Sequence, residues 1–341
     1  MNSLLKFITC GSVDDGKSTL LGHILYDAKL LYADQEKALI LDSKVGSHGG
    51  EIDYSLLLDG LTAEREQGIT IDVAYLYFTT ERRSFIAADT PGHEEYTRNM
   101  AVGASFASLA VVMVDAEHGV LSQTRRHARI CALMGIRYFV FAVNKMDLVD
   151  YRENRFEEIR KDINTLSGEL GLQHVKIIPV SATQGDNITQ ALNHMPWYQG
   201  GTLLDYLETV DVSEDEKQDT FYLPVQRVCR PDHTFRGFQG QVESGCVVKG
   251  QELTVLPGGE SAHVKAIHVG FDEVPEAVAG QAITIQLDRE VDVSRGCVLA
   301  NTGRLPVAKK VSATLLWMDD ELLFAGKEYL IRIGTKKISG V

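Results

Sequence analysis

The sequence has little that would place it in a membrane or hold it together by disulfides. None of its apolar runs approaches the roughly 18 residues of a membrane-spanning helix. Its start, Met1 to Ile8, lacks a small-residue cleavage site, so we expect no signal peptide. The five cysteines are odd in number, scattered and without Cys-x-x-Cys spacing. This pattern argues against a zinc site or a disulfide framework and predicts reduced thiols in a cytoplasm.

The chain also contains no internal repeat and no low-complexity tract. Its 341 residues are too many for one ordinary hydrophobic core, which predicts two or three domains. A hydrophobic content of 44% with 24% charged residues indicates a globular rather than a disordered protein. The net charge of −13 lies almost entirely in residues 1–218. Such an acidic surface disfavours non-specific binding to nucleic acid or anionic membrane, although it leaves room for a local basic patch.

The first part of the chain alternates short β-branched runs with helical stretches. Most of the expected strands are apolar throughout, which is typical of a sheet covered by helices on both sides. We expect strands at Leu4–Cys10, Ile71–Phe78, Ser84–Ala88, Leu109–Val114, Tyr138–Val143 and Lys176–Pro179. We expect helices at Lys17–Leu30, Glu94–Gly103, Gln123–Gly135 and Arg152–Leu170, with Gly135 and Gly171 as stops. The alternation predicts an α/β domain with a doubly wound, mostly parallel sheet.

After the polar, acidic stretch Val210–Asp219, which we interpret as a linker, the pattern changes. Short strands separated by glycine turns predict a small β-barrel or sandwich. These strands are expected at Tyr222–Cys229, Phe238–Ser244, Glu252–Leu256, Ala262–Val269, Ala282–Leu287 and Val298–Ala300. Beyond Pro306 a further strand-like series begins, with Lys310–Leu316 and Glu328–Ile333.

One motif in the first domain predicts a phosphate-binding loop. Gly11–Ser18 matches the pattern GxxxxGK[ST] directly after a strand and at the start of a helix. Its glycines allow main-chain N–H groups to surround phosphate oxygens, and the helix N-terminus adds positive charge. We expect Lys17 to contact the β- and γ-phosphates and the Ser18 hydroxyl to bind Mg²⁺. The loop residues assigned to the nucleotide are Gly11, Ser12, Val13, Asp14, Asp15, Gly16, Lys17, Ser18 and Thr19.

A second motif, Asn144-Lys145-Met146-Asp147, follows an apolar strand and predicts the base. A carboxylate at Asp147 can accept hydrogen bonds from N1–H and the exocyclic amine of guanine, which adenine does not offer together. Asn144 can bond the base and neighbouring backbone, and the stem of Lys145 can lie along the ring. Combined with the phosphate loop, the motif predicts GTP rather than ATP. Ser181 and Ala182 follow a later strand and could present N–H groups to guanine O6, an assignment that depends on these neighbours.

A third motif, Asp89-Thr90-Pro91-Gly92, is common by chance, so its position between the other two carries its meaning. There Asp89 would hold Mg²⁺ through water, and the Gly92 N–H would sense the γ-phosphate. His93 could orient an attacking water, although a lone histidine is as often a structural group. Thr70 could supply a second hydroxyl to Mg²⁺, but it could equally be an ordinary residue at the start of a strand. Together with Lys17, these residues form the predicted hydrolytic set: His93, Thr70 and Gly92.

The long stretch Leu31–Gln67 suits a segment that orders with the γ-phosphate and relaxes after hydrolysis. The alternative is an ordinary insertion with a helix of its own at Asp34–Leu41, and both can hold.

With these elements in order, the first domain resembles the translational GTPase superfamily. Within it, the chain is most similar to the large, GTPase subunits of bacterial heterodimeric sulfate adenylyltransferase (ATP sulfurylase). The resemblance covers essentially the whole chain and is carried by Asp14-Asp15, where elongation factors usually have Asp-His, by Ala63–Tyr75, by Tyr96–Met100 and, in the barrel, by Arg230–Asp232 and Phe235–Gly240.

The resemblance implies a GTPase domain followed by two β-barrels of the elongation-factor type, with GTP and Mg²⁺ as ligands. It also implies a smaller partner subunit that forms adenosine 5′-phosphosulfate and pyrophosphate from ATP and sulfate, driven by GTP hydrolysis in this chain. Some such proteins are fused to an adenylylsulfate kinase, but the chain has no second phosphate loop.

Two other readings stay open. An elongation factor that delivers aminoacyl-tRNA would share the fold and the nucleotide chemistry, and Asp15 and the string from Ala63 to Asp72 disfavour it. An assembly protein with a vestigial nucleotide site would need a broken motif, and none is broken. We therefore expect a cytoplasmic GTPase subunit with a protein partner and neither membrane nor nucleic-acid binding.

The motifs and the change of pattern also predict where each domain begins and ends. We expect a GTP-binding domain at 1–212, a β-barrel at 213–304 and the start of a third-domain barrel at 305–341. The last stretch holds too few strands to close a barrel, so we expect the chain to be a fragment of a longer protein.

Overall fold

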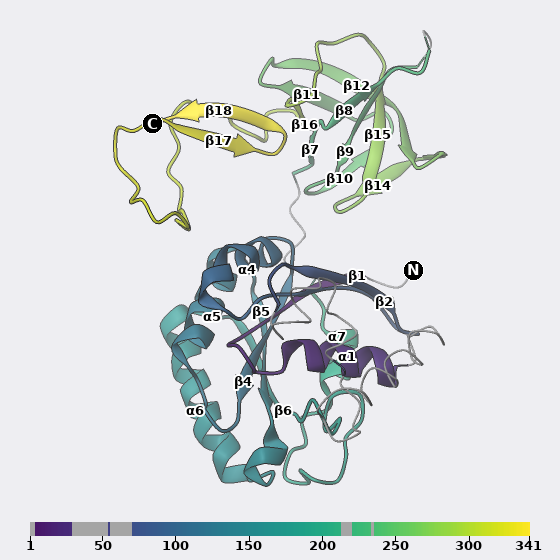
Figure 1. The fold of residues 1–341 in the computed structure, drawn as a ribbon. Coiled ribbons are helices and arrows are strands. Elements are labelled where there is room, and N and C mark those ends of the chain that lie inside the picture. The colour runs from purple at the N-terminus through teal and green to yellow at the C-terminus, as the bar shows by residue number, and fades with distance from the viewer. Residues whose placement is uncertain (1–3, 29–53, 55–69, 213–219, 233–234) are drawn as a thin grey trace. The chain divides into compact units, whose positions relative to one another are not determined.

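The computed structural model describes residues 4–28, 54, 70–212, 220–232 and 235–341 (Figure 1). The chain divides into two compact units, residues 1–212 and residues 213–341, which are treated separately below. Within the described ranges, no helix is both long enough and apolar enough to cross a membrane. The segment from Leu31 to Gln67, apart from Tyr54, lies outside the described residues, so its predicted ordering with nucleotide and its alternative helix at Asp34–Leu41 stay predictions.

The first unit is built on a six-stranded sheet in the order β2-β3-β1-β4-β5-β6. All neighbours pair in parallel except β2 and β3, which form an antiparallel pair at one edge. The strands are β1 (Leu4–Cys10), β2 (Ala74–Thr79), β3 (Ser84–Asp89), β4 (Leu109–Asp115), β5 (Tyr138–Asn144) and β6 (His174–Pro179). Every residue of β4 and β5 is buried, which is why these central strands are apolar up to their last residues, Asp115 and Asn144. The predicted α/β domain with a mostly parallel sheet is confirmed.

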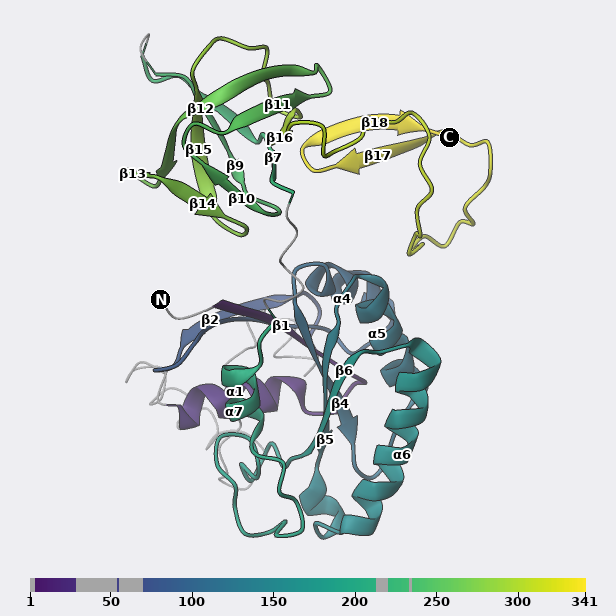
Figure 2. The ribbon, with the colours of Figure 1, turned by 180° about the vertical axis from the view of Figure 1, so that it is seen from behind.

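Helices cover both faces of this sheet (Figures 1 and 2). Helices α4 (Thr97–Ala104), α5 (Ser122–Leu133) and α6 (Glu153–Leu170) lie on one face, and α1 (Lys17–Asp27) and α7 (Leu203–Thr209) lie on the other. Short 3₁₀ turns occupy η2 (Glu94–Tyr96) and η3 (Met146–Val149). The core under α1 and α7 joins Leu20, Ile24 and Leu207 to Phe7 and Leu5 of β1.

The end of the first unit differs from the expected linker. Helix α7 was not predicted, although Thr202 caps it by accepting a hydrogen bond from the Asp205 N–H at 3.2 Å. Val210 and Val212, assigned from their sequence to the linker, instead pack against the core of this unit. The buried Arg83 donates to the Val210 carbonyl at 2.5 Å and so fixes the chain after the helix. Residues 213–219 lie outside the described part.

The second unit is an antiparallel sheet in the order β7-β16-β11-β12-β15-β9-β8, with β13 paired to β12 and a separate pair of β10 and β14. The Tyr222 N–H donates to the Ser244 carbonyl at 3.3 Å, which brings β7 back to the chain that follows β9 and curls the sheet around a core. The predicted β-barrel of the elongation-factor type is confirmed. Its strands are β7 (Tyr222–Pro224), β8 (Arg227–Cys229), β9 (Gly237–Gln241), β10 (Cys246–Val248), β11 (Glu252–Leu256), β12 (Glu260–Val269), β13 (Asp272–Val274), β14 (Glu276–Val278), β15 (Ala282–Leu287) and β16 (Val298–Asn301).

The last stretch of the chain holds a hairpin of β17 (Tyr329–Ile333) and β18 (Lys336–Gly340). The Thr335 hydroxyl donates to the Val225 carbonyl at 2.9 Å, which ties the hairpin turn to the preceding sheet. The prediction of a strand at Lys310–Leu316 is wrong, because that segment is largely exposed and pairs with no strand in the described structure. The assignment of residues 305–341 to a third barrel stays a prediction.

Candidate nucleotide-binding site

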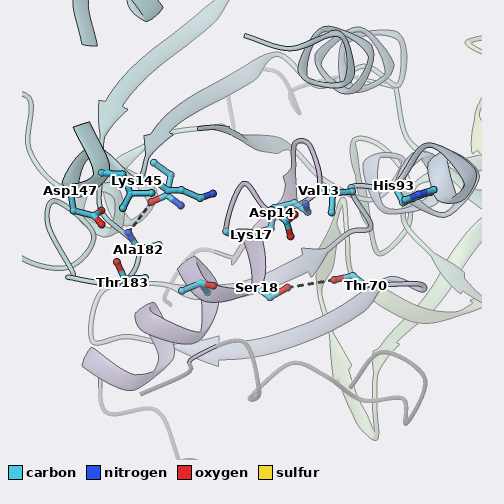
Figure 3. Close-up of a pocket in the computed structure, with 15 residues that line it drawn as sticks. Val13, Asp14, Lys17, Ser18, Thr70, His93, Lys145, Asp147, Ala182 and Thr183 are labelled. Atoms are coloured by element: carbon cyan, nitrogen blue, oxygen red, sulfur yellow. Dashed lines mark hydrogen bonds between the residues drawn. The ribbon is translucent and has the colours of Figure 1, made fainter. Parts of the chain in front are cut away.

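A cleft of about 410 Å³ lies at the carboxyl ends of the central strands of the first unit (Figure 3). Most of the predicted site residues line it: Val13, Asp14, Gly16, Lys17, Ser18, Thr19, Thr70, Gly92, His93, Asn144, Lys145, Asp147 and Ala182. Five predicted residues stand behind this wall rather than in it: Gly11, Ser12, Asp15, Asp89 and Ser181. The sequence motifs missed two lining residues, Leu148 and Thr183, each of which directly follows a predicted one.

The phosphate loop joins β1 to α1 and is packed tightly against its neighbours. Gly16 has φ +85°, and a Cβ there would lie 2.5 Å from the Asn144 Nδ2 atom. Lys17 is buried and donates from Nζ to the Ser12 carbonyl at 2.6 Å. Burial lowers the pKa of the Lys17 ammonium, against the raising effect of the carboxylate of Asp89. The loop therefore places the Nζ atom of Lys17 where phosphates are expected.

Asp15, which the resemblance singled out, faces into the loop rather than into the cleft. Its carboxylate accepts a hydrogen bond from the Ser12 N–H at 2.5 Å, and the side chain is 3% exposed. Burial raises the pKa of Asp15 to about 6, although the nearby charge of Lys17 lowers it. Asp15 thus braces the phosphate loop from inside at an electrostatic cost.

Oxygen donors gather at the start of α1. The Ser18 hydroxyl donates to the Asp89 carboxylate at 2.6 Å and lies 3.5 Å from the Thr70 hydroxyl (Figure 3). The other Asp89 oxygen accepts from the Thr9 hydroxyl at 2.7 Å, a contact that no motif indicated. Burial raises the pKa of Asp89, and the two hydroxyls and Lys17 oppose that shift. A buried carboxylate beside two hydroxyls matches the hard oxygen ligands that Mg²⁺ takes in phosphate sites.

The other end of the cleft carries the groups assigned to the base. The Asp147 carboxylate accepts from the Ser181 hydroxyl at 2.6 Å, which holds it at the carboxyl end of β5. Asn144 donates to the Asp15 carbonyl and accepts from the Ala182 N–H, both at 2.8 Å. The Ala182 N–H therefore has an acceptor in this structure, so a bond to guanine O6 requires that N–H to be shared or exchanged.

Lys145 is held by a residue that the motifs did not reveal. Its Nζ lies 2.7 Å from the carboxylate of Asp115, the last residue of β4. Burial raises the pKa of Asp115, but the hydrogen bonds from Lys145 and from the Glu117 N–H outweigh it, so the pKa is lowered overall. The only sequence signal for Asp115 was its place at the carboxyl end of a buried strand. The ion pair fixes the Lys145 stem along the base end of the cleft.

His93 lies at the opposite end of the cleft from Asp147 (Figure 3). Its side chain is exposed, and its Nδ1 atom accepts from the Glu95 N–H at 3.4 Å, a weak contact at the start of η2. Its neighbour Gly92 is in close contact with the phosphate loop, since a Cβ there would lie 2.5 Å from Lys17 Nζ. The imidazole is thus free to face a group bound beside the loop.

Known proteins resemble this chain in sequence and in fold. Residues 2–212 match the family described as the elongation factor Tu GTP binding domain. The crystal structure of the GTPase-like domain of Ski7 from S. cerevisiae, bound to GTP, superposes with a TM-score of 0.57 at 18% identity, over 89% of this chain and 76% of that one, which shows a shared fold.

Two curated relatives are much more similar in sequence. "Sulfate adenylyltransferase subunit 1" of Cellvibrio japonicus is 50% identical over 99% of this chain and 72% of its own length. "Bifunctional enzyme CysN/CysC" of Xylella fastidiosa is 54% identical over 98% of this chain, which spans only 54% of that protein. The chain therefore belongs to the sulfate adenylyltransferase subunit 1 family and carries the GTP-binding domain of elongation factor Tu.

Proposed function

We propose that this chain binds and hydrolyses GTP as the GTPase subunit of a sulfate adenylyltransferase. The observation that carries the proposal is the cleft itself, which joins the phosphate loop at one end to Asp147 at the other. An acceptor carboxylate held by Ser181 at the base end selects guanine over adenine, because adenine offers no adjacent pair of donors there. Membership in a family with this GTP-binding domain supports the same nucleotide.

The phosphate end provides charge and oxygen ligands. Lys17 and the main-chain N–H groups of the loop residues that line the cleft, Val13 to Ser18 apart from Asp15, hold the phosphates. Ser18 and Thr70 would supply hydroxyl ligands to Mg²⁺, and Asp89 would hold the ion through a water molecule. When bound, Mg²⁺ neutralises charge that develops on the phosphate oxygens. The 2.6 Å contact of Ser18 with Asp89 supports this proposal, because it brings two of the three proposed side chains together.

Hydrolysis needs a water positioned against the γ-phosphate. His93 is the candidate for that task, because it is exposed beside the phosphate loop and has no strong partner among the described residues. The Gly92 N–H senses the γ-phosphate, and Lys17 balances charge in the transition state. Asp15 and Ser181 act from behind the cleft wall by holding the phosphate loop and Asp147.

The wider role of the chain is inferred from its relatives. The name "subunit 1" indicates a partner subunit, which we propose to be the smaller adenylyltransferase subunit that acts in the cytoplasm. GTP hydrolysis in this chain would then drive the formation of adenosine 5′-phosphosulfate and pyrophosphate from ATP and sulfate. Delivery of aminoacyl-tRNA is the alternative, and the described likeness to elongation-factor-type proteins is far weaker than that to sulfate adenylyltransferase subunits.

The test compares purified chain with the chain co-expressed with its partner. Guanine nucleotide should bind the chain alone in the presence of Mg²⁺, and sulfate together with ATP should stimulate GTP hydrolysis only in the complex. Charged tRNA in a filter-binding assay provides the matched control for the alternative. Stimulation by ribosomes, or retention of charged tRNA with GTP, would show that the sulfate assignment is wrong.

A further inference from the structure

Helix α5 contacts the residues on both sides of His93. The side-chain amide nitrogen of Gln123 donates to the Gly92 carbonyl at 3.2 Å. One turn further along, the guanidinium of Arg126 pairs with the Glu94 carboxylate on the surface. The Arg126 pair is exposed and so contributes little, whereas the Gln123 contact is partly buried. The segment that carries the proposed hydrolytic histidine is therefore anchored chiefly through Gln123.

We propose that Gln123 is a positioning residue for His93, acting through the peptide that joins Gly92 to His93. Because a peptide is planar, fixing the Gly92 carbonyl also fixes the direction in which the chain enters His93. The other side of Gly92 is equally confined, since a Cβ there would lie 2.7 Å from the Ser12 carbonyl of the phosphate loop. The peptide is thus held between that loop and Gln123. This inference rests on the proposed GTP hydrolysis.

A buried histidine lies between the same glutamine and the phosphate loop. The Nδ1 atom of His127 accepts from the Gly11 N–H at 3.1 Å, and its Nε2 atom lies 3.2 Å from the Gln123 amide nitrogen. Burial, together with the charges of Lys17 and Arg126, lowers the pKa of His127 to about 3, so the ring is neutral. A neutral imidazole carries one proton. Because the Gly11 N–H must donate to Nδ1, that proton is on Nε2.

With the His127 proton on Nε2, the Gly92 carbonyl and the His127 ring require opposite orientations of the Gln123 amide. With its NH₂ group toward the Gly92 carbonyl, Gln123 presents a donor to the Nε2–H of His127, and two donors form no bond. With the amide turned over, its oxygen accepts from His127 but faces the Gly92 carbonyl, and two acceptors repel. Gln123 can therefore satisfy Gly92 or His127 but not both. Its hold on the Gly92–His93 peptide therefore depends on the amide orientation, and turning the amide over would exchange the bond to Gly92 for one to His127.

The experiment measures single-turnover GTP hydrolysis and nucleotide affinity for variants of the full chain in its complex with the partner. Gln123→Met removes the amide, and with it either possible hydrogen bond, at nearly constant side-chain length. Gln123→Glu keeps an acceptor for His127 but places a carboxylate against the Gly92 carbonyl. We expect hydrolysis about three- to tenfold slower for Gln123→Met and slower still for Gln123→Glu. Dissociation constants for GTP and GDP should stay within about twofold of wild type. Arg125→Gln, on the same helix in an exposed pair with Glu169, is the matched control and should change neither.

A double-mutant cycle separates positioning from general support. If Gln123 acts through His93, Gln123→Met should add no further loss in a His93→Ala background. Full additivity there, unchanged hydrolysis in both Gln123 variants, or an equal loss of GTP affinity and hydrolysis would each overturn the proposal. A wild-type complex that binds GTP without hydrolysing it would overturn the proposed function as well, an outcome distinct from active wild type with unaffected variants.

Discussion

Replacing Asp15 by asparagine should stabilise the first unit at neutral pH and have little effect in acid. The Asp15 carboxylate is 3% exposed and braces the phosphate loop through the Ser12 N–H. Burial raises its pKa from the ordinary 3.8 to about 6, against the opposing attraction of Lys17. Asparagine keeps an oxygen acceptor for the Ser12 N–H but never ionises. The variant therefore isolates the electrostatic cost of burying this carboxylate.

The sign and size follow from proton linkage. Between its unfolded and folded pKa values, Asp15 binds its proton more tightly in the folded protein, so the free energy of unfolding falls as pH rises. A pKa raised from 3.8 to about 6 corresponds to about 3 kcal/mol, present as stability below the unfolded pKa and lost once the pH has passed the folded pKa. The advantage of Asp15→Asn should therefore grow by up to about 3 kcal/mol between about pH 4 and pH 7 and then level off.

Tryptophan fluorescence can report this unit by itself. The two tryptophans of the chain fall in different units, Trp197 in the first and Trp317 in the second. Urea unfolding in a Trp317→Phe background, followed at several pH values, gives the required difference. Asp14→Asn is the control, because it removes the same formal charge from an exposed neighbour. A difference between Asp15→Asn and its parent that stays constant or shrinks with rising pH would refute the reasoning.

Four further substitutions test separate parts of the site and fold. Lys17→Ala should weaken GTP binding by about 1.5–3 kcal/mol, measured by calorimetry, because a charge-assisted phosphate contact is lost. Asp147→Asn should relax the preference for guanine over xanthine nucleotides in a competition assay, and an unchanged preference would contradict the role of Asp147. His93→Ala should leave nucleotide affinity intact and slow hydrolysis, so a loss of affinity would make His93 a structural residue. Arg83→Met should lower the free energy of unfolding by about 1–3 kcal/mol, because the buried Leu207 carbonyl and the partly buried Val210 carbonyl lose their donor, whereas Arg82→Met, at an exposed site, should have little effect.

The predictable parts of the fold are those in which the residues of a segment indicate by themselves whether it is buried and where it ends. Strands β1, β4 and β5 were located to within one residue, because burial makes most of their positions apolar. Helix α6 ends at Gly171 as expected, since a residue with φ +65° there favours glycine. The same local logic located the phosphate loop, whose residues are contiguous in sequence.

Prediction failed where a segment depends on a distant partner. The apolar residues of Lys310–Leu316 suggest a strand, but a strand forms only when another strand pairs with it, and that stretch has none in the described structure. The converse holds for Val210 and Val212, which begin a polar, acidic stretch and were therefore assigned to a linker. In the structure both pack against the core of the first unit, and Arg83, more than a hundred residues earlier, bonds the Val210 carbonyl. Neither outcome is encoded in a short window of sequence.

The same difference between local and distant determinants applies to the candidate site, in which one layer of residues is expected to touch the nucleotide and a second layer holds the first in place. Residues expected to touch the nucleotide occur in motifs because each group of them shares one short loop, whereas several of the residues that hold them come from other elements. Thr9 fixes Asp89, and Asp115 fixes Lys145. Asn144 belongs to both layers, because its side chain bonds the Asp15 carbonyl of the phosphate loop and the Ala182 N–H of the base loop. A residue assigned by its motif to base recognition is therefore also the link between the two ends of the cleft, so its substitution should disturb phosphate and base binding together.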